Sequence, residues 1–262
     1  MMHSMARKHV LVRLTVILFW VTVWSVLAAY LPDVLFAGPI DTLRCLLRQI
    51  QTTTFWISIL HSLCKITIGF VLAFLFGAML AIAGYYIRPI GILLEPAIQI
   101  MKTVPVACFI VVALIWLSSA HISVLVAFFV VFPAVYINLM QGLQQVDRSL
   151  LEMAQVFRVS RRKKIKALYL PQVMPYLLSS CRLGVGMAWK AGIAGEIIGL
   201  PDLSIGDQLY LAKLYLNTDE LFAWTIVIIC ISLLCEKIVV RILRSAETRW
   251  QGGLAWKSDL NK

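Results

Sequence analysis

Long apolar runs divide this sequence, and they limit what it can fold into more than any other feature. Each run is about as long as the roughly 20 apolar residues that an α-helix needs to cross a bilayer. Hydrophobic residues make up 61% of the chain and charged residues 14%, whereas a soluble domain carries about 25% charged residues. We therefore predict an all-α integral membrane protein, one transmembrane domain over residues 1–262 with about six transmembrane helices. The expected spans are approximately 13–31, 55–84, 96–117, 122–142, 175–199 and 221–243.

The segments at and between the spans add three expectations. The first run has about 17 apolar residues and is followed by only a weak cleavage site, so we expect an uncleaved first helix rather than a signal peptide. Apolar residues recur at helical spacing over about 40–50, which predicts a short interfacial helix. Pro105 interrupts the third span, and a kink is expected there.

The distribution of basic residues predicts the orientation. With the N-terminus inside, 17 of the 24 Lys and Arg residues lie on the cytoplasmic side, three lie outside (Arg44, Arg48 and Lys213), and four lie within or near spans. Cytoplasmic loops carry such an excess of Lys and Arg. We therefore expect a multi-pass protein of the cell membrane with both termini in the cytoplasm. The net charge of +11 then needs no nucleic-acid partner.

A basic loop over about 146–171 separates the fourth and fifth spans. Its first half repeats apolar residues at i, i+3, i+4 and i+7, which predicts one apolar stripe on a short helix. Ser160 is a candidate N-cap for a second helix, whose first turn carries Arg161 and its basic neighbours. Pro171 then leads into the next span. The stripe consists of Leu150, Met153, Ala154 and Phe157.

Two interpretations of this loop are open from its composition. A basic helix–turn–helix can simply rest on anionic lipid and fix the topology. The spacing favours a second one, because Glu152 and Ala154, followed at the right distances by Leu168, Leu170 and Pro171, resemble the cytoplasmic signature of binding-protein-dependent ABC permeases. That signature reads Glu-Ala-Ala, three residues, Gly, nine residues, Ile, one residue, Leu-Pro.

Three positions depart from the signature, and one of them matters for the backbone. Met153 replaces the first Ala and Leu168 replaces the Ile. Arg158 replaces the Gly, which would permit a left-handed turn between the two helices. Arginine in that conformation costs about 1 kcal/mol or more. Either the turn is built differently here, or the complex absorbs the cost.

The resemblance extends over most of the chain and points to the nitrate/sulfonate/taurine subfamily. The stretches that carry it are "SLCKITIGFVLAFLFGAML", "MKTVPVACFIVVALIW", "FFVVFPAVYINLMQG" and "GMAWKAGIAGEIIGLPDLSIGDQL". It implies a permease without its own ATPase site or cofactor, whose loop docks on a separate ATPase that binds ATP. It also implies a second permease copy, an extracytoplasmic solute-binding protein and a small anionic or polar solute. Consistent with this, no Gly-x-x-x-x-Gly-Lys-Ser/Thr fingerprint occurs.

The fifth span combines small residues with two charges and is the candidate translocation path. Gly192 and Gly195 let helices approach closely, so tight packing is the alternative to a path. Lys190 and Glu196 are costly in a bilayer unless they face a cavity or a partner. Six residues place them about 120° apart around the helix, so they should not pair with each other. Lys190 either attracts an anionic solute or forms a structural ion pair with another helix.

Competing classes are an intramembrane enzyme and an ATP-independent secondary transporter. An enzyme would need a catalytic constellation, and the charged residues of the spans are too scattered for one. A secondary transporter often shows an inverted repeat, which this sequence lacks. The six cysteines lack the spacing of a metal site or a disulfide framework, so no metal centre is expected.

Overall fold

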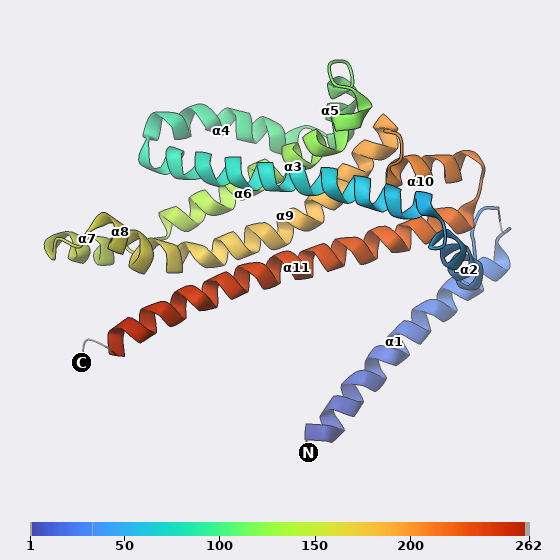
Figure 1. The fold of residues 1–262 in the computed structure, drawn as a ribbon, viewed down its shortest axis with the longest axis horizontal. Coiled ribbons are helices and arrows are strands. Elements are labelled where there is room, and N and C mark those ends of the chain that lie inside the picture. The colour runs from blue at the N-terminus through green and yellow to red at the C-terminus, as the bar shows by residue number, and fades with distance from the viewer. Residues whose placement is uncertain (1, 33, 260–262) are drawn as a thin grey trace.

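The computed structural model describes residues 2–32 and 34–259, and over these residues every regular element is a helix (Figure 1). The prediction of an all-α protein is therefore confirmed. Two elements are not α-helices: η1 is a 3-10 turn and η2 a π-helix. The bounds are α1 Met2–Tyr30, α2 Pro39–Gln49, α3 Thr53–Tyr86, α4 Arg88–Thr103, α5 Val106–Ala113, η1 Ser119–His121, α6 Ile122–Gln144, α7 Arg148–Val156, α8 Arg161–Lys164, η2 Ile165–Tyr169, α9 Leu170–Gly199, α10 Ile205–Leu214 and α11 Thr218–Asp259.

The core of the molecule is the packing of α3, α6 and α9 on one another. Buried small and branched side chains such as Ala73, Val131 and Ala188 fill it. Gly69 marks a close approach of α3 to α6, because a Cβ there would lie 2.5 Å from the carbonyl oxygen of Val124. Without a hydrophobic effect between helices in lipid, such close approach supplies the van der Waals contact that holds them together.

Within the described residues, two helical segments are long and apolar enough to cross a membrane: α3 and the η1–α6 segment, Ser119–Gln144. The α4–α5 pair meets these criteria only jointly, because α4 has 16 residues and α5 has eight. The two helices bend by 103° at their junction. The kink expected at Pro105 is therefore confirmed, because the chain turns at Val104 and Pro105. The expected start of this span at about 96 is wrong, because α4 already begins at Arg88. Proline has no N–H and pushes the residue before it out of the helical region, and Val104 is extended. The count of six spans remains a prediction.

The two ends of the bundle carry different elements (Figure 1). Short helices α2 and α10 gather at one end, while α7 and α8 project from the opposite end. The long α11 runs between these ends, and α1 diverges from the bundle. The indole of Trp24 attaches α1 by donating to the carbonyl oxygen of Ala37 at 3.0 Å and by packing against the ring of Phe222.

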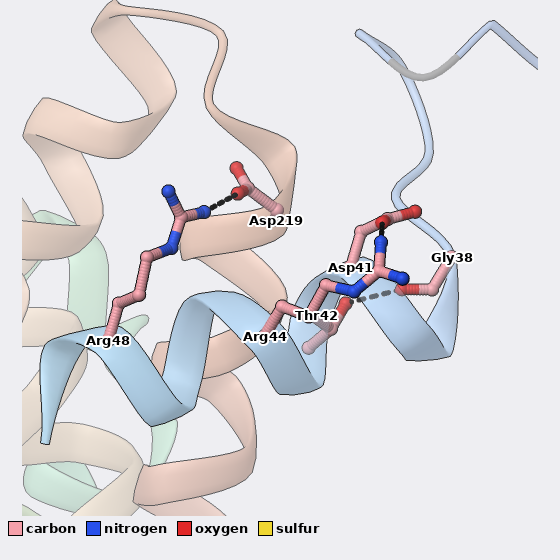
Figure 2. Close-up of polar contacts among 6 residues, drawn as sticks. All are labelled: Gly38, Asp41, Thr42, Arg44, Arg48 and Asp219. Atoms are coloured by element: carbon pink, nitrogen blue, oxygen red, sulfur yellow. Dashed lines mark hydrogen bonds and ion pairs between the residues drawn. The ribbon is translucent and has the colours of Figure 1, made fainter.

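Helix α2 confirms the short helix expected over about 40–50, and its polar side faces the start of α11 (Figure 2). Arg48 reaches Asp219 at 3.9 Å, and Arg44 pairs with Asp41 at 3.2 Å within the helix. Thr42 is buried and donates to the carbonyl oxygen of Gly38 at 2.9 Å. Because both arginines are exposed, these ion pairs contribute little stability, and the burial of Thr42 and Cys45 does more to hold α2 in place.

Candidate functional site

The projecting loop begins with a capped helix. One Asp147 carboxylate oxygen accepts hydrogen bonds from the backbone N–H and the hydroxyl of Ser149, both at 2.8 Å. These bonds lower the pKa of Asp147 below its ordinary value, with the hydroxyl bond contributing most. The backbone N–H of Asp147 donates to the side-chain oxygen of Gln172 at 3.0 Å, which ties the start of α7 to the start of α9.

Arg158 takes the left-handed conformation that the glycine of the permease signature would favour, with a φ of 48°. Two hydrogen bonds close the end of α7 around it. The N–H of Arg158 donates to the carbonyl of Gln155 at 3.0 Å, and that of Val159 to the carbonyl of Ala154 at 2.9 Å. This is the Schellman pattern. The turn is therefore not built differently here. It keeps the left-handed form, with arginine in the position of the glycine.

The second half of the loop differs from the prediction in its cap and its continuity. Ser160 occupies the N-cap position of α8, but its side chain accepts no capping hydrogen bond, so the predicted cap is wrong. The helix then continues from Arg161 through η2 into α9 without a break, and it carries Leu168 and Leu170. Pro171 has no N–H for the carbonyl four residues earlier, and the helix is widened into the π-turn just before it.

The apolar side chains of the stripe predicted for α7 differ in exposure. Ala154 is buried and Leu150 is half-buried, whereas Met153 and Phe157 are 51% and 75% exposed. Val156, which the stripe omitted, is 78% exposed and joins the latter two at helical spacing. Glu152 is also exposed. We call Met153, Val156 and Phe157 the loop triad. The stripe therefore lies across the boundary between the packed and the exposed sides of α7, so only part of it is available to a partner.

Aromatic contacts fix the loop to the end of the bundle. The ring of Tyr169 in η2 lies 6.5 Å from that of Tyr85 and 6.4 Å from that of Tyr86, which end α3. Edge-to-face and tilted ring pairs of this kind add about 0.5–1.5 kcal/mol each beyond their burial. The loop is therefore seated on α3 as well as on α9, while its triad stays exposed.

A buried carboxylate lies toward the other end of α9. Glu196 has no exposed surface. Its oxygens accept hydrogen bonds from the hydroxyl of Ser62 in α3 at 2.7 Å, the hydroxyl of Ser123 in α6 at 3.0 Å and the backbone N–H of Gly206 in α10 at 3.2 Å. Lys65 is near enough for its charge to act on the carboxylate. We call these hydrogen bonds the Glu196 clasp, which joins four helices.

The clasp also fixes the start of α10. The Ser62 hydroxyl, which donates to Glu196, also accepts a hydrogen bond from the backbone N–H of Ile205 at 2.9 Å. Ser204 caps α10 by accepting from the N–H of Asp207 at 3.0 Å. Gly206 lies so close to Glu196 that any Cβ at this position would collide with the Cβ of Glu196. Sequence reasoning missed Ser62, Ser123 and Gly206, because isolated small polar residues in apolar runs carry no periodic signal.

The four residues expected along the translocation path do not share one side of α9. Gly192 and Gly195 are buried, and Cβ atoms there would meet Ile66 at 2.6 Å and Val126 at 3.3 Å, so they pack α9 on α3 and α6. Lys190 is exposed. Within residues 2–32 and 34–259 no ion pair includes Lys190, so the structural ion pair is not found inside this chain. As expected, Lys190 and Glu196 do not pair with each other.

Comparison with known proteins agrees with this arrangement. Residues 73–251 match the family described as Binding-protein-dependent transport system inner membrane component. The chain belongs to this family, and it is an ABC transporter permease of the nitrate/sulfonate/taurine subfamily, a membrane protein.

Individual relatives lie within that subfamily. The taurine transport system permease protein TauC of Escherichia coli is 28% identical, over 76% of this chain and 72% of its own length. The nitrate import permease protein NrtB of Synechococcus elongatus is 26% identical, over 78% and 84%. A solved amino acid ABC transporter with histidines shares the fold, with a TM-score of 0.52 at 19% identity, covering 73% of this chain and 90% of that chain.

Proposed function

We propose that this chain forms half of the translocation path of an ATP-driven importer and is driven through residues 146–171 by a separate ATPase subunit. It works as one transmembrane domain over residues 1–262, with a second copy supplying the other half of the path. An extracytoplasmic binding protein delivers the solute. ATP is bound by the ATPase, and this chain does no covalent chemistry. The alternatives, a secondary transporter or an intramembrane enzyme, need no such ATPase.

The loop triad is the observation that carries this proposal. Three apolar side chains at the end of a projecting helix are exposed, whereas the neighbouring Ala154 and the aromatic seat at Tyr169 hold the loop in place. A short helix that presents anchors at i, i+3 and i+4 fits a groove on a partner protein. Glu152, on the same helix, is exposed beside the triad and available to the partner.

The loop end of the bundle is cytoplasmic by this proposal, and so are both chain termini. The excess of Lys and Arg on that side supports the orientation. A cysteine replacing Lys164 should then be inaccessible to a membrane-impermeant thiol reagent in intact cells, and one replacing Asp207 should react. The opposite labelling pattern would reverse the topology.

Lys190 is the residue we assign to the translocation path. It is exposed although the adjoining Trp189 and Ala191 are buried, and a charge facing lipid costs several kcal/mol. An exposed ammonium therefore belongs on a water-filled or partner-facing side of α9. Taurine and nitrate, named for two relatives, carry anionic groups that such a charge attracts. Gly192, Gly195 and Glu196 serve packing beside the path.

The test of the proposal is to purify the permease with its ATPase and measure retained ATPase and solute-stimulated hydrolysis. Phe157→Ala should weaken ATPase binding by about 2 kcal/mol, the usual effect of removing a central aromatic anchor, and uncouple hydrolysis from uptake. A control variant with Lys163→Gln and Lys164→Gln should do much less, because exposed charges are screened. Full binding and coupling in Phe157→Ala, with loss of both in the lysine variant, would show that the loop works by charge instead.

A further inference from the structure

A cavity of about 560 Å³ lies between α3, α4 and α6, at the end of the bundle from which the loop projects. Its lining is mixed in charge and polarity, unlike the apolar surfaces of the same helices. A volume in this range accommodates a small solute with some water. Its polar lining consists of a guanidinium, a carboxylate, three amides and two phenols, from Arg88, Glu95, Gln99, Gln141, Gln144, Tyr85 and Tyr136.

The two charged groups are held apart along one side of α4. Arg88 and Glu95 are seven residues apart, which places them on the same face and about 10 Å apart along the axis. No ion pair joins them, and neither pairs with another described residue. Glu95 is near enough to Tyr136 to act electrostatically on its phenol. A positive and a negative side chain therefore line the same cavity, and each can form an ion pair with a bound solute.

The opposite wall comes from the end of α6. Gln141 and Gln144 are three residues apart and so face the cavity together. Tyr136, on the same helix, also lines the cavity and is buried. The close approach of Gly84 in α3 to Gly91 in α4 forms the base, since a Cβ on Gly91 would lie 3.1 Å from the carbonyl oxygen of Gly84. The groups thus come from two rigid helices rather than from a loop.

We propose that this cavity is a solute-binding site for a small zwitterion, in which Glu95 receives the ammonium group and Arg88 the anionic group. The proposal rests on the permease function argued above and narrows its solute class. A simple oxyanion would meet repulsion from Glu95, and a simple cation would meet repulsion from Arg88. A zwitterion satisfies both charges, and the amides of Gln99, Gln141 and Gln144 hydrogen-bond to the remaining polar atoms.

The site also adjoins the segment that carries the loop. Tyr136, Gln141 and Gln144 lie in the last turns of α6, which ends at Gln144. Helix α7 begins four residues later, at Arg148. The charge of Arg148 acts on Tyr85, which lines the same cavity. A bound solute therefore lies against the helix end that leads into the loop.

The experiment is equilibrium binding to the purified permease–ATPase complex, without the binding protein. The probes are taurine and β-alanine, two small zwitterions, and ethanesulfonate, which resembles taurine but lacks the ammonium group. Both zwitterions should bind, and ethanesulfonate should bind about tenfold more weakly. Glu95→Gln should weaken taurine binding about tenfold and remove the preference over ethanesulfonate, as expected when one charge-assisted contact is lost. Gln141→Leu is a second variant that retains both charges, and it should also weaken taurine binding.

Glu220→Gln is the matched control, because it removes the same charge outside the cavity, and it should bind taurine like the wild type. The inference is overturned if neither zwitterion binds, if ethanesulfonate binds as well as taurine, or if Glu95→Gln and Gln141→Leu both bind taurine normally. Retained ATPase and ATP hydrolysis are measured on the same preparations. A complex that holds and drives its ATPase but fails these binding tests refutes the zwitterion site alone, whereas loss of the ATPase from the wild-type permease refutes the proposed function.

Discussion

Removing the carboxylate of the Glu196 clasp should release α10 from the bundle. In Glu196→Ala three donors lose their acceptor: the hydroxyls of Ser62 and Ser123 and the backbone N–H of Gly206. The hydroxyls can turn toward carbonyls of their own helices, but the N–H of Gly206 is fixed by the backbone. A buried donor without a partner costs about 1–3 kcal/mol, so we expect a total loss of about 3 kcal/mol. Glu196→Gln keeps one acceptor oxygen and should lose about 1 kcal/mol.

Amide hydrogen exchange of the purified protein, followed by mass spectrometry, measures this effect where it should occur. Exchange in α10 should increase by about two orders of magnitude in Glu196→Ala, which is the factor that corresponds to about 3 kcal/mol. Exchange in α7, far from the clasp, should not change. Glu236→Gln is a matched control, because this half-buried carboxylate pairs with the exposed Arg182 at 3.4 Å outside the clasp and its loss should leave α10 protected.

A triple variant separates the clasp from a general loss of packing. Replacing a buried polar cluster by apolar groups is often nearly neutral, so Glu196→Met combined with Ser62→Ala and Ser123→Ala should recover part of the lost stability. If Glu196→Ala leaves α10 as protected as in the wild type, the carboxylate does not hold this helix and the reasoning fails.

Three further predictions concern the loop and α9. Arg158→Gly should stabilise the permease by about 1 kcal/mol, because glycine takes the left-handed turn without strain; a lower thermal midpoint in detergent would contradict this. Asp147→Ala should increase hydrogen exchange in α7, whereas Asp147→Asn keeps a capping oxygen and should not. Because the pKa of Asp147 is lowered in the fold, its contribution is present above the unfolded value of about 3.9 and should disappear as the pH falls through the lower folded value. Lys190→Met should reduce uptake of a solute that carries an anionic group without lowering the yield of complex; unchanged uptake would remove Lys190 from the path.

The apolar runs and the signature residues were enough to predict the fold class and the family. The bilayer sets how long an apolar span must be and on which side Lys and Arg accumulate. Both properties can be read from the composition of each segment, without knowledge of its contacts. The bend between α4 and α5 was harder to place, because Pro105 indicates a break but not the direction in which the chain leaves it. The start of α9 was missed by five residues because the basic loop joins it as one helix.

The details of the site depend on contacts that no local pattern records. The spacing within α7 predicts a helix, but only packing on the bundle decides that Ala154 turns inward while Val156 is exposed. Glu196 was recognisable as a charge that needs partners. Its partners Ser62, Ser123 and Gly206 come from three other elements, and distance along the sequence hides them.

The uninterrupted helical path from Arg161 to Gly199 has a mechanical consequence. The clasp fixes this path near one end, at Glu196, and the projecting loop lies near the other, 35 residues away. If it moves as a rod, Glu196 is the fulcrum of a lever with a long arm of about 52 Å and a short arm of about 9 Å to Lys190. A tilt of about 5° would then sweep the loop end through about 5 Å but move Lys190 by less than about 1 Å. Such gearing exchanges a large, weak displacement at the loop for a small, forceful one at Lys190.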